Sequence, residues 1–165
     1  MSDRGGIGLG RKASGWIPEP LWRQVKANMP IACVDLVVHN HRGAVLLGWR
    51  VIKPYVNVWA TPGGRIRMGE TLAGTAHRVL SSHGLAANGF YLVGVFPVRF
   101  SSRFDISICL ATGSFSGAPV PDGTEFKKIG WFRNLPGNTG KNYVEMIEKW
   151  RRIRKSAYFM NLNRI

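Results

Sequence analysis

The sequence predicts one α/β domain, an α/β/α sandwich around a mixed β-sheet. Three observations predict it: β-branched runs typical of strands, a glycine loop that leads into a short helix, and an amphipathic helix near the C-terminus. Strands that alternate with two helices can bury the apolar face of each helix against the sheet. The chain has 165 residues, 45% of them hydrophobic and 19% charged, which suits one globular domain with its own core.

The domain is expected to span residues 17–165, because residues 1–16 are glycine-rich and basic and predict a flexible segment. Pro20–Ala27 suits a short helix, since proline is tolerated in the first turn. Ile31–Val38 is a β-branched run that predicts a strand around Asp35. A lone carboxylate in such a strand needs a partner, and we expect an arginine.

Later segments continue the same pattern. Asn40–Gly43 predicts a turn, so Ala44–Val51 is expected to pair with the preceding strand as a hairpin. Gly113–Thr124 is rich in Gly, Pro and Ser and predicts a loop. The remaining expected elements are three strands and a terminal amphipathic helix: Phe90–Phe100, Arg103–Thr112, Lys127–Phe132 and Lys141–Lys155.

Residues 59–85 form the most informative stretch, with an extended run, a glycine loop, a helix and a glycine stop. Gly63 and Gly64 allow a backbone to approach a phosphate or a metal closely. Gly84 is expected to end the helix as its C′ residue. A helix that begins after Glu70 is predicted by four apolar residues at helical spacing: Leu72, Ala76, Val79 and Leu80.

The composition indicates which kinds of partner the protein can bind. With 23 Lys and Arg against 9 Asp and Glu, the formal net charge is +14 at pH 7, which favours nucleotide phosphates or RNA as a polyanionic partner. Charge alone does not separate these two. We expect no membrane partner, because no apolar run reaches about 18 residues. Cys33 and Cys109 lie in apolar runs and are expected to be buried free thiols, which fits a reducing, cytoplasmic location.

The stretch from Gly64 to Gly84 resembles the Nudix box, the loop-helix motif of hydrolases that cleave nucleoside diphosphates linked to another group. Gly64, Glu70 and Arg78 match the first glycine, the first glutamate and the arginine of that motif. The resemblance implies that these three residues brace the loop, and for Arg78 a substrate contact is equally open. The late glutamates that hold a divalent cation in the family are absent here.

The resemblance extends to the GDP-mannose mannosyl hydrolase branch, through Asn40–Gly43, Leu46–Arg50 and Pro62–Arg65. It implies a substrate-binding role for one aspartate and three arginines: Asp35, Arg50, Arg65 and Arg78. It also implies that Arg50 and Arg65 stabilise the leaving group. Their chemistry suits this role, because an arginine fork binds two oxygens and keeps its proton, and Arg67 is a further candidate.

The metal site is where the match fails. The glutamate that this branch keeps as a metal ligand falls on His83, and its glutamine ligand and histidine base lie in a loop that matches Pro121–Trp131. Alignment from either end of that loop gives one of these roles to Glu125. The implied ligands are thus a carbonyl near Gly63, His83 and Glu125, with Glu125 also the candidate base and Asp122 a further oxygen donor. Three alternatives are open: weakly held Mg²⁺, a softer ion such as Mn²⁺, or no metal.

Two functions follow from these observations. The first is a Nudix-type hydrolase of a nucleoside diphosphate-linked substrate, best a nucleotide sugar such as GDP-mannose, which releases a nucleoside diphosphate. The second is a catalytically impaired Nudix-fold protein that binds nucleotide or RNA through its basic surface. The substrate-side arginines favour the first, and the missing glutamates and the charge favour the second. The sequence leaves open whether the C-terminal helix packs internally or forms a homodimer.

Overall fold

The structure is a computed structural model that describes residues 17–155. The segment 1–16 that we predict to be flexible lies outside the described residues, as do residues 156–165 of the predicted domain. The described part holds three helices and nine strands. In chain order these are α1 (Glu19–Asn28), β1 (Ile31–Val38), β2 (Val45–Arg50), β3 (Val58–Ala60), β4 (Gly63–Arg65), α2 (Leu72–Ser82), β5 (Leu85–Ala87), β6 (Tyr91–Arg99), β7 (Phe104–Thr112), β8 (Phe115–Gly117), β9 (Phe126–Phe132) and α3 (Lys141–Ile153).

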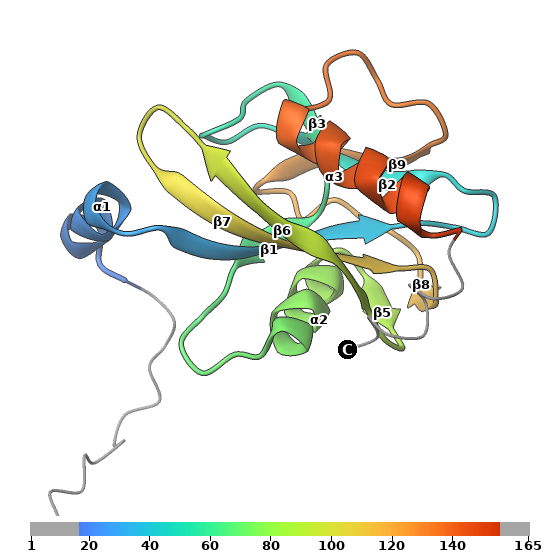
Figure 1. Ribbon diagram of the computed structural model, residues 1–165, viewed down its shortest axis with the longest axis horizontal. Coiled ribbons are helices and arrows are strands. Elements are labelled where there is room, and N and C mark those ends of the chain that lie inside the picture. Colours follow the sequence, from blue (N-terminus) through green and yellow to red (C-terminus); the bar gives the residue numbers. More distant parts are fainter. Residues whose placement is uncertain (1–16, 156–165) are drawn as a thin grey trace, which may run out of the picture.

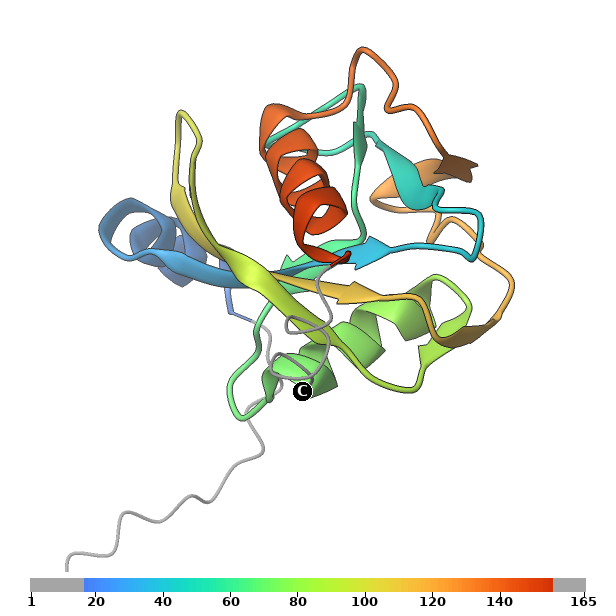
Figure 2. The same cartoon turned by 45° about the vertical axis from the view of Figure 1, so that its right-hand side comes forward.

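The central sheet has the strand order β4-β1-β7-β6. Strands β1 and β7 run parallel, whereas β4 and β6 are antiparallel to their neighbours, so the sheet is mixed. Helix α2 lies on one side of this sheet and α3 on the other (Figures 1 and 2). A second sheet, β3-β2-β9, lies on the side of α3. The predicted α/β/α sandwich around a mixed sheet is therefore confirmed.

Helix α2 begins and ends where the sequence predicts. Thr71 is its N-cap and accepts a hydrogen bond from the backbone N–H of Gly74 at 3.0 Å. Gly84 follows the helix with φ of +72°, the left-handed conformation in which glycine is favoured. A side chain there would also crowd the carbonyl oxygen of Ala118. The helix therefore has a fixed length and cannot extend past Gly84 without strain.

The predicted hairpin of the first two strands is wrong. Strand β2 pairs with β3 and β9, and only an isolated bridge from His39 to Val45 joins it to the end of β1 among the described residues. The reason is that β7 occupies the whole of one edge of β1, and β4 occupies the other edge from Cys33 to Asp35. The glycine loop and the long polar loop also contain short strands that we did not predict. Gly63–Arg65 forms β4, and Phe115–Gly117 forms β8, which pairs with β5.

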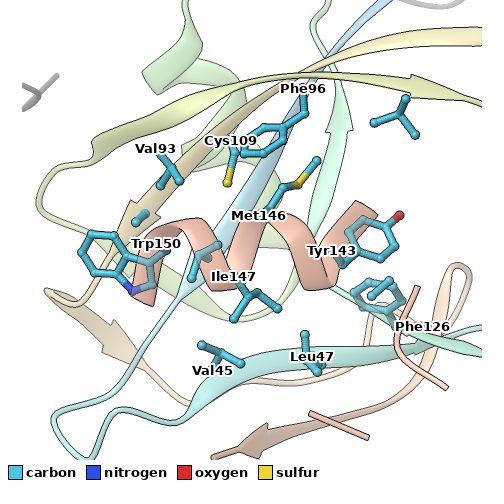
Figure 3. Packing of buried hydrophobic residues seen from close by; sticks show 14 residues of the cluster. Val45, Leu47, Val93, Phe96, Cys109, Phe126, Tyr143, Met146, Ile147 and Trp150 are labelled. Atoms are coloured by element: carbon cyan, nitrogen blue, oxygen red, sulfur yellow. The ribbon is translucent and has the colours of Figure 1, made fainter. Parts of the chain in front are cut away.

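Two hydrophobic layers hold the helices on the sheet. The layer under α2 contains Val34, Leu36 and Val38 of β1, and the layer under α3 contains Val37. Successive strand residues point to opposite faces, so β1 contributes to both layers. On α3 the predicted apolar face is buried, as Figure 3 shows: Tyr143, Met146, Ile147 and Trp150. This face of α3 packs internally.

Two further expectations concern the cysteines and the membrane. Cys33 and Cys109 are both buried and free, as predicted. Burial raises the pKa of the Cys33 thiol to about 12, so it stays protonated at neutral pH. Within residues 17–155, no helix is both long enough and apolar enough to cross a membrane.

Candidate functional site: a cleft between cationic and polar surfaces

A cleft of about 510 Å³ lies over the first halves of β1 and β7. On the face of the sheet that α3 covers, the side chains of these two strands change from polar to apolar along their length. Val37, Cys109 and Ala111 join the core under α3. The polar residues before them line the cleft, and we call them the polar floor: Cys33, Asp35, Asp105 and Ser107. Because residues two apart share one face of a strand, this change places the cleft at one end of an otherwise apolar layer.

Asp35 is held in the floor by a neutral partner. Its Oδ2 accepts a hydrogen bond from the hydroxyl of Ser107, and Arg50 contributes only a longer-range charge interaction. Burial raises the pKa of Asp35 to about 6, although the Ser107 hydrogen bond and the Arg50 charge oppose this. Our expectation of an arginine partner for Asp35 is thus wrong. Gly63 lies opposite on β4, where any Cβ would collide with the Asp35 carboxylate.

Four arginines line the cleft, and we call them the arginine wall: Arg50, Arg65, Arg67 and Arg78. The wall is braced by Glu70. Its carboxylate accepts hydrogen bonds from Nε and Nη2 of Arg78 at 2.6 and 2.8 Å, and Arg78 Nη2 also donates to the Arg65 carbonyl at 2.8 Å. The Arg78 hydrogen bonds lower the pKa of Glu70 to about 2. The predicted bracing pair therefore exists, and Arg78 lines the cleft as well.

Further contacts of Glu70 and Arg65 fix the glycine loop before α2. Glu70 accepts a hydrogen bond from the backbone N–H of Arg67 at 3.0 Å and one from the Thr75 hydroxyl at 2.9 Å. The guanidinium of Arg65 lies over the ring of Trp22 on α1, 4.4 Å from its centroid. These contacts fix the backbone that follows Arg65, and the ring of Trp22 lies against its guanidinium.

Arg50 and Glu125, both predicted to be catalytic, line the cleft and form an ion pair with each other. Arg50 also donates from Nε to the Ile52 carbonyl at 3.2 Å and from Nη2 to the Lys53 carbonyl at 3.1 Å. The structure thus brings these two predicted residues together and fixes the guanidinium. The Glu125 carboxylate is therefore held next to Arg50 in the lining of the cleft.

The third predicted metal ligand, His83, has a different setting. Its side chain is only 4% exposed, and its ring stacks on Phe126 at 5.2 Å between centroids. Nδ1 lies 3.2 Å from the Val120 carbonyl oxygen, and such a hydrogen bond requires a proton on Nδ1. Burial lowers the pKa of His83, which favours the neutral ring. His83 does not line the cleft.

Asp122, the further oxygen donor, is used by its own loop. It accepts hydrogen bonds from the backbone N–H groups of Thr124, Glu125 and Phe126, at distances of 2.8–3.2 Å. Among residues 17–155, no group of three or more His, Cys, Asp or Glu side chains is arranged to hold a metal ion. The structure therefore does not gather Gly63, His83 and Glu125 into one site, and their role as metal ligands stays a prediction.

Sequence reasoning missed several residues of the cleft, and an ion pair is among them. Asp105 and Arg103 both line it, and Arg103 donates to Asp105 Oδ2 from Nε at 3.1 Å and from Nη2 at 2.6 Å. A signal was present in the sequence. Arg103, Asp105 and Ser107 alternate with Phe104 and Ile106, which is the pattern of a strand with one polar face.

Solved structures of known proteins resemble this arrangement. The MutT NUDIX hydrolase from Burkholderia pseudomallei superimposes with a TM-score of 0.67 and 21% identity, covering 74% of this chain and 98% of that one. The NUDIX domain of Shewanella oneidensis NrtR, solved with ADP ribose, gives a TM-score of 0.67 and 18% identity, covering 85% of this chain and all of that one (100%). These likenesses define the fold as that of Nudix hydrolases.

The sequence comparison gives the family. Residues 29–134 match the NUDIX domain. The chain therefore belongs to the NUDIX domain family. It is also similar to the low-salt glycan biosynthesis protein Agl8 from Haloferax volcanii, with 43% identity over 63 residues, which are 38% of this chain and 40% of that protein.

Divalent cations such as Mg²⁺ or Mn²⁺ are the usual cofactors of Nudix hydrolases, and the donor set of this cleft does not fit one. The Glu125 carboxylate forms an ion pair with Arg50, and the His83 ring points into the core. Mg²⁺ requires several oxygen ligands in octahedral geometry. We therefore assign no step of the reaction to a protein-held metal.

Proposed function

We propose that this chain is a hydrolase of nucleoside diphosphate-linked compounds, acting best on a nucleotide sugar such as GDP-mannose and releasing the nucleoside diphosphate. The observation that carries the proposal is that the arginine wall and the polar floor line one cleft. A diphosphate needs cations aimed at its oxygens, and a sugar needs groups that bond to hydroxyls. Two comparisons support this proposal: a similar domain was solved with ADP ribose, and Agl8 is described as a glycan biosynthesis protein.

In the proposed reaction, a water oxygen bonds to the glycosidic carbon while the bond from that carbon to the diphosphate oxygen breaks. The nucleoside diphosphate leaves with the electron pair of that bond, and Arg50 and Arg65 stabilise its developing charge. Glu125 takes the proton from the water. Asp35 and Arg78 bind substrate from the floor and the wall.

The test is titration calorimetry with GDP, with and without Mn²⁺, followed by an assay of GDP release from GDP-mannose in the same buffers. We expect binding and turnover, and Arg65→Ala should lower kcat/KM by about 100-fold, the usual cost of losing one group that stabilises the leaving charge. Arg152→Ala is the matched control, because Arg152 is exposed on α3 and does not line the cleft. If no nucleotide sugar in a panel releases its nucleoside diphosphate with Mg²⁺ or Mn²⁺, the proposal is wrong.

One observation favours the second candidate, a Nudix-fold protein that binds nucleotide or RNA without hydrolysis. That observation is the combination of a net charge of +14 with the absence, among the described residues, of a cluster suited to a metal. The same titration separates the two. Tight binding of GDP without metal and without turnover would support a nucleotide receptor. Association with RNA that weakens steeply with added salt would support the RNA form, and its absence at moderate ionic strength would exclude that form.

A further inference from the structure

Two groups of residues with opposite chemistry line the cleft, the arginine wall and the polar floor. The arginine wall offers hydrogen-bond donors and positive charge, which suit phosphate oxygens. The polar floor offers two carboxylates, Asp35 and Asp105, and Thr61 lines the same cleft. These two carboxylates lie on one face of the β1–β7 pair, four residues apart in register, and disfavour a further phosphate group on the floor. A ligand that fills both surfaces therefore carries negative charge at one end and hydrogen-bond donors at the other.

Asp105 is the least satisfied of the floor carboxylates. Only 4% of the residue is exposed, and its Oδ2 takes the two Arg103 hydrogen bonds together with a weak one from the Cys33 thiol at 3.9 Å. Its Oδ1 has no hydrogen-bond partner among residues 17–155. Burial raises the pKa of Asp105 even though Arg103 opposes it, so its present partners do not fully offset the loss of water.

Thr61 shows the same feature. The residue is only 3% exposed, and its Oγ1 has no hydrogen-bond partner within the described chain. Buried polar atoms in folded proteins are nearly always hydrogen-bonded, because leaving one unpaired costs about 1–3 kcal/mol. Both orphaned oxygens belong to residues that line one cleft. A ligand with hydroxyl groups would supply the missing partners.

Building on the proposed function, we propose that Asp105 and Thr61 recognise hydroxyl groups of the moiety linked to the diphosphate, so the cleft selects a hydroxyl-rich diphosphate derivative over a nucleoside triphosphate. Asp105 Oδ1 accepts a hydrogen bond from a substrate hydroxyl. Arg103 is a positioning residue, since its two N–H groups hold the other oxygen and fix the plane of the carboxylate. The terminal phosphate of a triphosphate has no donor to offer at neutral pH, and both floor carboxylates would repel it.

The test compares three ligands, GDP, GDP-mannose and GTP, by titration calorimetry of the full-length protein and its variants. Asp105→Asn keeps the shape, but the single amide oxygen is drawn to Arg103 and the charge is lost. We expect Asp105→Asn to bind GDP-mannose about tenfold more weakly, the usual difference between a charged and a neutral acceptor, with GDP affinity within about twofold of wild type. The preference for GDP-mannose over GTP should fall by at least as much.

Thr61→Val provides a variant that does not depend on how Asp105 variants fold. The hydroxyl has no protein partner to lose, so exchange for a methyl group should leave the melting temperature equal or higher. GDP-mannose should bind about threefold more weakly to it, with GDP unchanged. If both variants keep the wild-type preference for GDP-mannose over GTP, the inference is overturned.

Arg65→Ala separates this inference from the proposed function. As a residue of the arginine wall, it should weaken the binding of all three ligands together. Wild-type protein that binds GDP-mannose through Asp105 but releases no GDP would overturn the proposed hydrolysis and support the recognition. Turnover with an unchanged preference in both floor variants would support the hydrolase and overturn the recognition. Failure of wild type to bind any of the three ligands would overturn both.

Discussion

The two ends of α2 belong to the same sequence motif, the Nudix box, but they have different surroundings in the structure. Glu70, just before the beginning of α2, forms a hydrogen-bonded ion pair with Arg78 of the helix, and Arg78 also bonds to the Arg65 carbonyl and lines the cleft. At its end, His83 packs against Phe126 and bonds to a backbone carbonyl, away from the cleft. One end of the helix thus shapes the candidate site, and the other end belongs to the core.

This difference explains why the Nudix box is kept at one end and lost at the other. Arg78 holds the loop that carries Arg65, so its loss would disturb the arginine wall even if no metal binds there. His83 occupies a buried position in which a neutral ring with one hydrogen bond is satisfied. A carboxylate at that position would face the Val120 carbonyl oxygen and the nearby negative charge of Asp122. The residue that replaced the glutamate is therefore suited to packing, and the loop geometry survives independently of a metal site.

The largest effect should come from placing a carboxylate at the core end. We expect His83→Glu to lower the free energy of unfolding by about 3 kcal/mol, because a buried charge would face the Val120 carbonyl without a cation. Urea denaturation at pH 7 measures this. His83→Gln is the matched control, with an amide N–H that can still donate to Val120, and should lose about 1 kcal/mol. A stable His83→Glu protein that gained Mn²⁺ binding would show that this end still reaches the cleft.

The next effect concerns the brace at the other end. Glu70→Gln should lower the free energy of unfolding by about 2 kcal/mol at pH 7, since a partly buried charged hydrogen-bond pair is lost. The pKa of Glu70 is lowered from 4.5 to about 2 in the folded protein, so its stabilisation is fully present above pH 4.5 and is lost as pH falls toward 2.

Denaturation of wild type and Glu70→Gln between pH 7 and pH 3 tests this sign. The difference in stability should shrink steadily as the pH falls below 4.5. Arg23 and Glu19 form an exposed pair on α1, so Glu19→Gln is a control that should change stability little at any pH. A difference that stayed constant with pH would mean that Glu70 acts by packing rather than through its charge.

Much of the fold could be predicted from the sequence because its signals are local. The β-branched run of β1, the cap at Thr71 and the glycine at Gly84 each depend on a few adjacent residues. The partner of β2 could not be predicted this way, because it depends on which edges of β1 are free. That is decided by β4 and by β7, which pair with opposite edges of β1, and β7 is distant in the sequence.

The candidate site, like the fold, could be predicted only where its signal is a local motif. Arg50, Arg65, Arg78 and Asp35 were found through motif resemblance, and all four line one cleft. Asp105 was missed, although its alternation with apolar neighbours marked a polar face, because the sequence does not show that β1 and β7 are adjacent. The packing of His83 was also hidden, since Val120 and Phe126 lie far along the chain. Pairwise contacts between distant segments decide both cases.

The smallest expected effect is that of the helix cap, and it tests whether the cap and the Glu70–Arg78 ion pair act independently. Thr71→Ala removes the side-chain cap of α2 and should lower the free energy of unfolding by about 1 kcal/mol. Thr71→Ser keeps the capping oxygen and should behave like wild type. Neither variant touches the Glu70–Arg78 pair, so GDP affinity should stay unchanged in both. Loss of affinity in Thr71→Ala alone would mean that the cap, and not only the ion pair, positions the loop of Arg65, and the two ends of α2 would then differ less than their contacts indicate.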